Sequence, residues 1–428
     1  MKVRLQYGAT GLALTVPDGA DVLRPAPAPP LRRPLAAVHA AVAAVARGPR
    51  AARLGRPGQR AAIVVSDVTR LMPNSLVLAP ILALLEARGV RRQDTTIIIG
   101  TGLHRPSREG ERVRILGARL AARCRVVDHA ARDPATLAPA GRTASGAPLA
   151  LCRDYLAADV RVLTGFVEPH LFAGFSGGGK AVLPGIAGAE AILRNHDARM
   201  LAHPRATWCE AAGNPIFDEM RAAALATDPA FIVNVTLDER RRLTGVFAGE
   251  LAAAHDAAIA AARRQAERPL ARRADLVVVT NMGYPADLLL YQAVKGLSVA
   301  ARACADGGAI VLCAECREGL GSPEYVAMLR RAAAPGPFLD ALAAAPPVID
   351  QWQVQVQALV QRRCTVYLHS ALSPALVAQA HLAPAPDLDA TVALLVAQRR
   401  RALGREPRVC VLPYGQLTVP VVEGDASP

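Results

Sequence analysis

Two of the chain's three lysines lie inside its most motif-like stretches. Lys2, Lys180 and Lys295 are the only lysines among 50 lysine and arginine residues. Arginine keeps its proton, whereas a lysine amine can lose its proton and act as a nucleophile. Lys180 and Lys295 are therefore candidates for chemistry that arginine cannot perform. The alternative is that both are solvated charges that remain by chance near the ends of loops.

Lys180 ends the glycine-rich run 174–180, with the sequence GFSGGGK. The run matches the first seven residues of a P-loop, but the eighth, which must be serine or threonine to hold magnesium, is Ala181. The strand predicted before the run also ends too early, at Phe166. A row of glycine amides can still cradle one phosphate. A nucleotide- or metal-dependent hydrolase or kinase that uses this run is therefore kept only as an alternative.

Two polar motifs directly follow predicted strands. In the first, Asp67 and Thr69 can bond sugar hydroxyls, and the Arg70 guanidinium can grip a carboxylate with two parallel hydrogen bonds. Its alternative is a helix N-cap with a surface ion pair. The second contains His104, and histidine titrates near neutrality, as a general base must. A purely structural histidine is the alternative there.

His170 and His196 flank the glycine run. A glycine loop that ends in lysine, with two histidines and no carboxylate pair, favours a phosphorylated cofactor combined with proton transfer or metal ligation. Only the tertiary fold can bring these histidines together, because they are too far apart for one helix face. Cys313 and Cys316 form a lone CxxC without partners at zinc spacing, so we assign it no metal or redox role.

Alternating strands and helices are expected to position these motifs. The expected strands are 61–66, 95–100, 160–166, 276–280, 309–313 and 365–368, and the expected helices are 75–87, 107–119, 188–201, 285–305, 351–362 and 388–403. This alternation predicts two α/β domains with largely parallel sheets and an active site in the cleft between them. We predict a catalytic and cofactor-binding domain over 1–268 and a C-terminal domain over 274–406. The tail 407–428 is expected to pack back on the first domain, and the proline-dense segment 24–34 to form a surface arm.

Composition argues against several classes of protein. A hydrophobic content of 52% argues against disorder. The net charge of +14 comes from scattered arginines without interleaved aromatics, so we expect anionic small molecules rather than nucleic acid as partners. No apolar run reaches about 18 residues, so we expect no membrane partner and a cytoplasmic location. The eight irregularly spaced cysteines fit reduced, buried thiols.

Six motifs, in this order, resemble those of the nickel-dependent lactate racemase family. They are DVTR at 67–70, TGLH at 101–104, EPH at 168–170 leading into GFSGGGK at 174–180, NH at 195–196, QAVKG at 292–296 and DQW at 350–352. Each motif is weak alone, but six in order are specific. The resemblance runs from about residue 60 to residue 370, which is most of the chain.

The resemblance implies a racemase or epimerase of a 2-hydroxy acid, lactate or a related 2-hydroxycarboxylate. It implies a nickel pincer nucleotide (pyridinium-3-thioamide-5-thiocarboxylic acid mononucleotide) linked covalently to Lys180, with His196 as a nickel ligand. It implies His104 and His170 as the paired acid and base. The implied substrate site contains Arg70, Gln292, Lys295 and Trp352, and the implied nucleotide site contains Asp67, Thr69, Ser176, Gly177 and Gly178.

Hydride transfer is the reaction that the resemblance implies. The α-hydrogen of a hydroxy-carboxylate is a poor acid, because its removal builds a dianion. Hydride abstraction avoids this difficulty when one base takes the hydroxyl proton and the cofactor takes the hydride, which leaves a planar 2-keto acid. Return of the hydride to the opposite face inverts the centre, and each proton transfer contributes roughly 10²–10⁴-fold. Proteins that synthesise and deliver the cofactor are the implied partners.

Two residues depart from the family pattern. Val68 stands where histidine is expected in members that act on lactate, and Leu71 stands where proline is common. Both lie beside the implied carboxylate site, so the reaction class is better supported than lactate itself, and a larger or differently substituted 2-hydroxy acid fits the motifs. A non-enzymatic cofactor-binding protein is the second alternative. The presence of both His104 and His170 argues against it, because binding alone needs no pair of bases.

Overall fold

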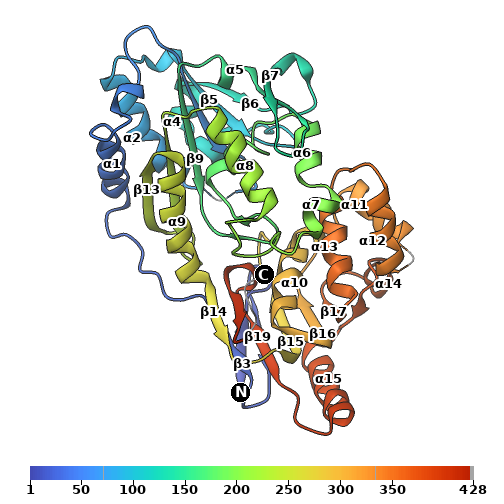
Figure 1. Ribbon diagram of the computed structural model, residues 1–428. Helices are drawn as coiled ribbons and strands as arrows, with labels where there is room; N and C mark the ends of the chain where they lie inside the picture. Colours follow the sequence, from blue (N-terminus) through green and yellow to red (C-terminus); the bar gives the residue numbers. More distant parts are fainter. Residues whose placement is uncertain (71, 333, 425–428) are drawn as a thin grey trace.

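The computed structural model describes residues 1–70, 72–332 and 334–424, so Leu71 and the last four residues of the predicted tail lie outside the described residues. Two six-stranded sheets dominate the described chain, and each is covered by helices (Figure 1). The strand pairs of the second sheet are parallel, and β12–β13 is the antiparallel pair of the first. The predicted α/β class with largely parallel sheets is confirmed.

The first sheet has the strand order β13-β12-β9-β4-β5-β6. Its strands are β4 (Ala61–Ser66), β5 (Thr95–Gly100), β6 (Arg125–Asp128), β9 (Val160–Phe166), β12 (Phe231–Leu237) and β13 (Leu243–Gly249). Strands β4, β5 and β9 have the predicted bounds, because strands buried on both faces read as uninterrupted apolar runs. They are parallel neighbours, so their carboxyl ends meet at one edge of the sheet.

Successive residues of the first sheet enter two different cores. Ile63 and Val65 pack on one face, while Ala62 and Val64 pack on the other. The first face is covered by α1 (Pro34–Val45), α2 (Asn74–Ala87), α3 (Glu111–Leu116) and α4 (Ala118–Arg123). The opposite face is covered by α5 (Arg153–Leu156), α6 (Ala189–Asn195), α8 (Pro215–Ala226) and α9 (Leu251–Ala266). This sheet and its helices form the first unit.

The second sheet has the strand order β18-β17-β16-β15-β19-β3. Its strands are β3 (Asp21–Val22), β15 (Ala274–Thr280), β16 (Cys304–Cys313), β17 (Thr365–His369), β18 (Ala383–Pro384) and β19 (Val409–Leu412). One face carries α10 (Leu290–Ala303), α11 (Pro323–Arg331), α13 (Gln351–Gln361) and α14 (Pro374–Gln379). The other face carries α15 (Leu388–Leu403) and the hairpin of β1 (Lys2–Leu5) and β2 (Leu12–Thr15). These elements form the second unit.

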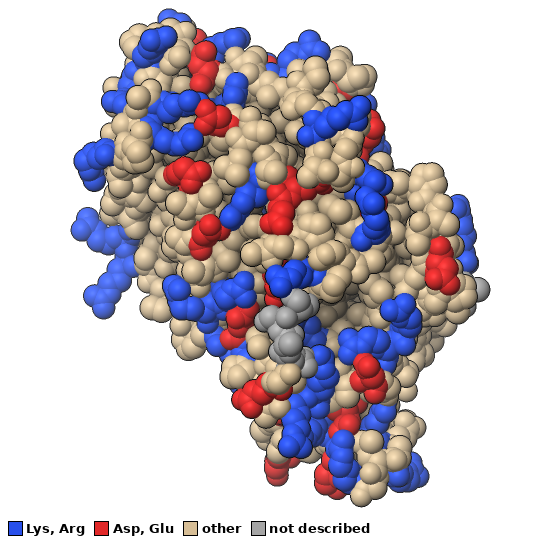
Figure 2. Space-filling model, viewed as in Figure 1, with Lys and Arg blue, Asp and Glu red and all other residues tan. Residues whose placement is uncertain are grey.

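Smaller elements complete the fold. Three further strand pairs are β7 (Leu137–Arg142) with β8 (Pro148–Cys152), β10 (Pro169–His170) with β11 (Gly174–Phe175), and β14 (Glu267–Leu270) with β20 (Val419–Val422). Helices α7 (Ala198–Ala202) and α12 (Pro335–Ala344) lie near α13, where the two units meet. Basic and acidic side chains are intermingled over both units on the face seen in Figure 2. No described helix is long and apolar enough to cross a membrane.

Three predicted helices differ from the structure. The predicted helix 107–119 is replaced by α3 and α4, which are separated by Gly117 at a φ of 83°. The predicted helix 188–201 is divided into α6 and α7, because the Asp197 side chain accepts from the Met200 amide and caps a new helix. The predicted helix 285–305 begins only at Leu290 and ends at Ala303, where strand β16 follows directly.

The division of the chain near residues 268–274 stays a prediction. Both ends of the described chain contribute to the second sheet, because β19 pairs with β15 and β3 pairs with β19. This differs from the expected place of residues 21–22 in the first domain and of residues 409–412 against it. The cause is that β19 is a fully buried apolar strand, which is covered on both sides when it lies between β15 and β3 inside the second sheet. Strand β20 instead pairs with β14, next to α9.

Candidate functional site

The carboxyl ends of three neighbouring strands bring the predicted polar motifs together. Asp67, Thr69 and Arg70 follow β4, His104 follows β5, and His170 follows β9. Ligands of parallel α/β sheets bind at this edge, beyond the carboxyl ends of the strands. The strand order therefore explains how motifs about 100 residues apart in the sequence come to share one site.

Asp67 holds His104 in one orientation. The buried Asp67 Oδ2 lies 2.7 Å from His104 Nδ1, and Oδ1 accepts from the Thr69 hydroxyl at 2.6 Å. Burial acts to raise the pKa of Asp67, but the hydrogen bonds and charges of His104, Arg70 and Thr69 lower it below its usual value. An ionised carboxylate requires a proton on His104 Nδ1, which leaves a lone pair on Nε2 of the neutral ring. The His104 side chain is 47% exposed, so Nε2 is accessible to a ligand.

His170 has the opposite arrangement. Its Nδ1 accepts a hydrogen bond of 3.2 Å from the Ala173 amide, so the neutral ring carries its proton on Nε2. Burial, together with the charges of Lys180, Lys295 and Arg70, lowers the pKa of His170 well below its usual value. The ring is therefore neutral at physiological pH. Of the two predicted acid–base histidines, His104 therefore offers a lone pair and His170 offers an N–H group.

A row of aromatic rings connects His170 to the second unit. The ring centroids of His170 and Phe172 are 4.6 Å apart, those of Phe172 and His196 are 5.0 Å apart, and those of His196 and Trp352 are 5.2 Å apart. His196 Nδ1 is buried and has no hydrogen-bond partner among the described residues. Burial and the nearby Lys180 lower the pKa of His196 to about 3, so the ring is neutral, as a metal ligand must be.

Lys180 and Lys295 face the same site from different units. The Lys180 ammonium lies 6.0 Å from the Phe172 ring centroid, and burial, Arg70 and Lys295 lower its pKa to about 7. Lys295 comes from α10, and burial and Arg70 lower its pKa to about 7 as well. A substantial fraction of each amine is therefore uncharged at neutral pH. Because Arg70 acts on both lysines and Lys295 acts on Lys180, these three cations lie around one site between the units.

The glycine run does not have P-loop geometry. Gly178 to Ala181 form a short 3-10 turn, where a P-loop continues into an α-helix. The Ser176 hydroxyl donates to the Phe166 carbonyl, and the Gly178 amide donates to Asn234 Oδ1 at 3.0 Å. Among the described residues, neither the Gly177 amide nor the Gly179 amide donates a hydrogen bond. The predicted nucleotide site thus retains two unpaired amides, while the amides of Ser176 and Gly178 are already hydrogen-bonded.

Trp352 is fixed by a hydrogen-bond network of the second unit. Its Nε1 donates to the Tyr291 hydroxyl at 3.1 Å, and that hydroxyl donates to Asp350 Oδ1 at 2.8 Å. Ser322 donates to the other Asp350 oxygen at 2.5 Å. Sequence reasoning missed Tyr291, although it directly precedes the predicted Gln292. Among the described residues, no hydrogen bond reaches the Gln292 side chain, which lies on the same helix as Lys295.

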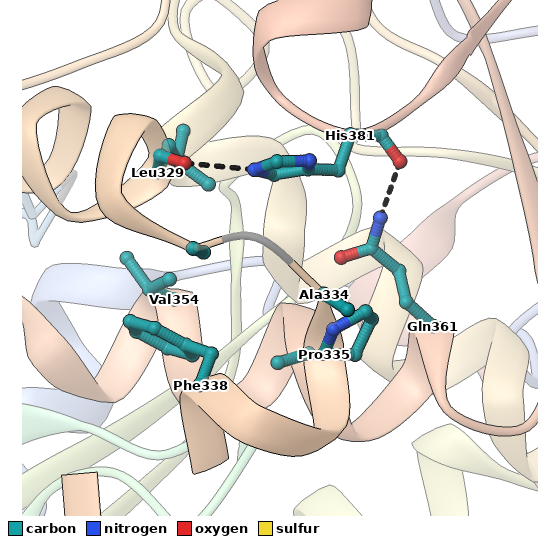
Figure 3. Close-up of a pocket in the computed structure, with 9 residues that line it drawn as sticks. Leu329, Ala334, Pro335, Phe338, Val354, Gln361 and His381 are labelled. Atoms are coloured by element: carbon teal, nitrogen blue, oxygen red, sulfur yellow. Dashed lines mark hydrogen bonds between the residues drawn. The ribbon is translucent and has the colours of Figure 1, made fainter. Parts of the chain in front are cut away.

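One pocket adjoins these residues, and a second pocket lies elsewhere, in the second unit. A cavity of about 250 Å³ lies between the β12–β13 hairpin and the loop that follows β15, and its lining includes Arg240, Arg241 and Tyr284. Arg241 and Glu168 are 3.9 Å apart and both influence Lys295, so this cavity adjoins the site. The second pocket is apolar and lies among α11, α12 and α13. Figure 3 shows His381 bonded there to the Leu329 carbonyl, and none of the predicted site residues lines this pocket.

Comparisons with known proteins show the family of the chain. The model of the lactate racemase N-terminal domain matches residues 7–209, and that of the lactate racemase C-terminal domain matches residues 270–421. A lactate racemase from Lactiplantibacillus plantarum is 33% identical over 367 residues, which cover 85% of each chain. A lactate racemase from Thermoanaerobacterium thermosaccharolyticum is also 33% identical, over 70% of each chain.

Solved structures agree as well. The lactate racemase apoprotein from Thermoanaerobacterium thermosaccharolyticum has a TM-score of 0.88 and 27% identity, and the match covers 98% of this chain and all of that one. A protein from Thermotoga maritima has the same fold, with a TM-score of 0.68, 17% identity and coverage of 91% and 98%. Both family models and a relative that matches most of the chain give the same answer. The chain therefore belongs to the lactate racemase family and is an isomerase.

Proposed function

We propose that the chain is a racemase or epimerase of a 2-hydroxy acid, lactate or a related 2-hydroxycarboxylate, that depends on nickel in a nickel pincer nucleotide. The relatives that match it are named lactate racemases. The observation that carries the proposal is the Lys180 amine, whose pKa is lowered to about 7 and which shares one site with His170, His196 and Lys295.

The residues present fit this cofactor. Lys180 is a partly uncharged amine, as covalent attachment requires, and the buried His196 Nδ1 lacks a partner. The unpaired amides of Gly177 and Gly179 suit an anionic group, and Thr69 is exposed nearby. We propose Lys180 as the covalent tether, His196 as the nickel ligand, and the loop of Ser176–Gly178 with Asp67 and Thr69 as the nucleotide site. When bound, the cofactor would supply hydride-transfer chemistry, with an acceptor for the substrate's α-hydrogen as hydride and a donor of that hydride to either face of the planar keto acid.

His104 and His170 are proposed as the paired acid and base. The lone pair on His104 Nε2 takes the hydroxyl proton, and the ionised Asp67 stabilises the imidazolium that forms. His170 Nε2–H donates a hydrogen bond to the substrate oxygen on the other side. With the protons of the two histidines placed in this way, turnover therefore begins when His104 takes the hydroxyl proton. Turnover in the other direction requires the His170 proton to move from Nε2 to Nδ1, so that Nε2 presents a lone pair.

Arg70 and Lys295 are proposed to hold the substrate carboxylate, which must stay fixed while the carbonyl turns over. A planar guanidinium binds a carboxylate with two parallel bonds, and Lys295 adds a compact charge from the opposite unit. Gln292 and Trp352 complete the proposed pocket, and the Tyr291 hydrogen bond holds the Trp352 indole in place. Val68 is apolar where lactate-acting relatives are expected to carry histidine, so a substrate larger than lactate is part of the proposal.

Intact mass, nickel content and chiral analysis test this function together. Protein made alongside proteins that synthesise and deliver the cofactor should carry an adduct on Lys180 and about one nickel ion per chain, and it should interconvert enantiomers of a 2-hydroxy acid. Lys180→Arg keeps the charge but is not a nucleophile, so it should show neither adduct nor activity. Active wild-type protein with an unmodified mass would contradict the tether.

A further inference from the structure

The loop that carries Lys180 rests on a histidine that the proposed reaction does not use. His255 lies on α9 and is 1% exposed. Its Nε2 lies 3.0 Å from the Ser176 carbonyl, and its ring stacks on Phe217 with a centroid distance of 5.5 Å. Burial lowers the pKa of His255 to about 4, so the ring is neutral in ordinary buffers. A carbonyl can only accept, so Nε2 carries the proton and donates it to Ser176.

His255 also fixes the path of the chain at Gly178. Gly178 has a φ of 51°, in the left-handed region, and a Cβ at this position would overlap the His255 ring. Asn234 accepts from the amide of the same residue at 3.0 Å. The ring and the amide side chain therefore hold Gly178 between them. Gly178 needs both its backbone freedom and its missing side chain.

The hydrogen bond to Ser176 anchors the backbone directly before the unpaired loop amides. The 3-10 turn begins at Gly178, because Gly177 has a φ of 80° and a ψ of −168°, outside the helical region, so the turn does not use the Ser176 carbonyl. His255 donates to the Ser176 carbonyl. Among the described residues, the amides of Gly177 and Gly179 donate no hydrogen bond. Lys180 follows immediately, and its amide donates a hydrogen bond of 3.1 Å to the Gly177 carbonyl. The bond from His255 therefore holds the backbone that leads into the free amides and the lysine.

We propose that His255 is a positioning residue for the cofactor, which holds the Ser176 carbonyl so that the Gly177 and Gly179 amides can receive an anionic group of the nucleotide while Lys180 is tethered. This role rests on the proposed function, because it requires a nucleotide at the loop. His255 touches neither substrate nor nickel. It acts through the backbone between Ser176 and Lys180.

Replacement of His255 by glutamine or methionine separates the hydrogen bond from packing. The two side chains have similar length and volume, but only glutamine has an N–H group that reaches the Ser176 carbonyl. Each full-length variant is made alongside the cofactor-synthesis proteins, and the adduct fraction and nickel per chain are measured by intact mass and metal analysis. Thermal melting of the same samples reports the fold.

His255→Gln should load cofactor within about twofold of wild type, whereas His255→Met should load about tenfold less at a similar melting temperature, as expected for the loss of one buried hydrogen bond. If His255→Met is poorly folded, the smaller His255→Leu, which also has no N–H group, replaces it, with the same expected loss. Loading by a folded donor-less variant equal to wild type, or an equal loss in His255→Gln, would overturn this role alone. Wild-type protein without any adduct would overturn the proposed function, and this role with it.

Discussion

At the scale of residues, His104 and His170 differ in the nitrogen that their neighbours leave open. Asp67 fixes the proton of His104 on Nδ1, while the Ala173 amide fixes that of His170 on Nε2. Two chemically identical side chains would therefore start the proposed turnover in different roles. This difference depends on a carboxylate and a backbone amide that lie outside the histidine motifs, so histidine spacing alone did not indicate it.

Replacement of His104 should remove catalysis and leave the cofactor in place. His104→Gln should lower racemisation by roughly 10²–10⁴-fold, the usual contribution of a positioned base, with adduct and nickel content unchanged. Arg105→Gln is the matched control, because Arg105 pairs with Glu111 at 2.7 Å instead of facing the site. Initial rates from each pure enantiomer provide the measurement. Normal racemisation by His104→Gln would show that another group takes the hydroxyl proton.

Attachment at Lys180 should depend on pH. Burial, Arg70 and Lys295 lower the pKa of its amine to about 7, and only the uncharged amine attacks an electrophile. The rate of adduct formation in apoprotein should therefore rise with pH through about 7 and then level off. Lys295→Met removes one of the charges that lowers this pKa, so its midpoint should move upward. Time-resolved intact mass at several pH values measures both profiles, and identical midpoints would disprove the coupling.

At the scale of elements, strand β11 shows how tightly the site is built into the fold. Gly174 has a φ of 68°, and a Cβ there would collide with the Glu210 carbonyl. Gly146, in the turn between β7 and β8, has a similar φ of 86° but no atom within 4 Å of the same position. The two glycines therefore separate backbone conformation from close packing.

Alanine at these two glycines should have unequal effects on stability. Gly146→Ala should lower the free energy of unfolding by about 1 kcal/mol, the cost of a left-handed non-glycine residue. Gly174→Ala should lower it by at least about 3 kcal/mol, because the backbone around Glu210 must also move. Urea unfolding of both variants tests the difference. Equal losses would mean that this part of the chain moves freely to accept a side chain.

The sequence predicted some elements well because their physical signal is local. Strands β4, β5 and β9 are short and largely apolar, and the motifs at their ends follow from the geometry of parallel sheets. The break between α6 and α7 was missed, because Asp197 was not recognised as a cap. The contacts of Tyr291 with Trp352 and of His255 with Ser176 join residues that are 61 and 79 positions apart, so no local pattern indicates them.

At the scale of the whole molecule, the site gathers positive charge from both units. Lys180 and Arg70 belong to the first unit and Lys295 to the second; Arg70 makes both lysines harder to protonate, and Lys295 does the same to Lys180. An anionic cofactor and an anionic substrate relieve this repulsion. The cluster is therefore the feature of the fold that is most clearly built for anionic ligands.

Apoprotein stability should record this repulsion. The folded lysines have pKa values of about 7, far below that of an unfolded lysine, so between these values only the unfolded chain binds the protons. The free energy of unfolding should rise with pH between about 7 and 8.5, by at most about 1.4 kcal/mol per pH unit for each lysine. Lys295→Met should roughly halve this slope in urea unfolding. A wild-type profile that is flat over this range would contradict the lowered pKa values.

The fate of the α-hydrogen tests the proposed reaction most directly. Enantiopure 2-deuterolactate, or a larger 2-deuterated 2-hydroxy acid if lactate is not accepted, is incubated with cofactor-loaded enzyme in ordinary water. The product enantiomer is then separated and its deuterium content measured by mass spectrometry. Transfer and return of the same hydride predicts that the inverted product keeps its deuterium at C2. Inverted product that contains solvent hydrogen instead, or no inverted product from any 2-hydroxy acid, would contradict the account.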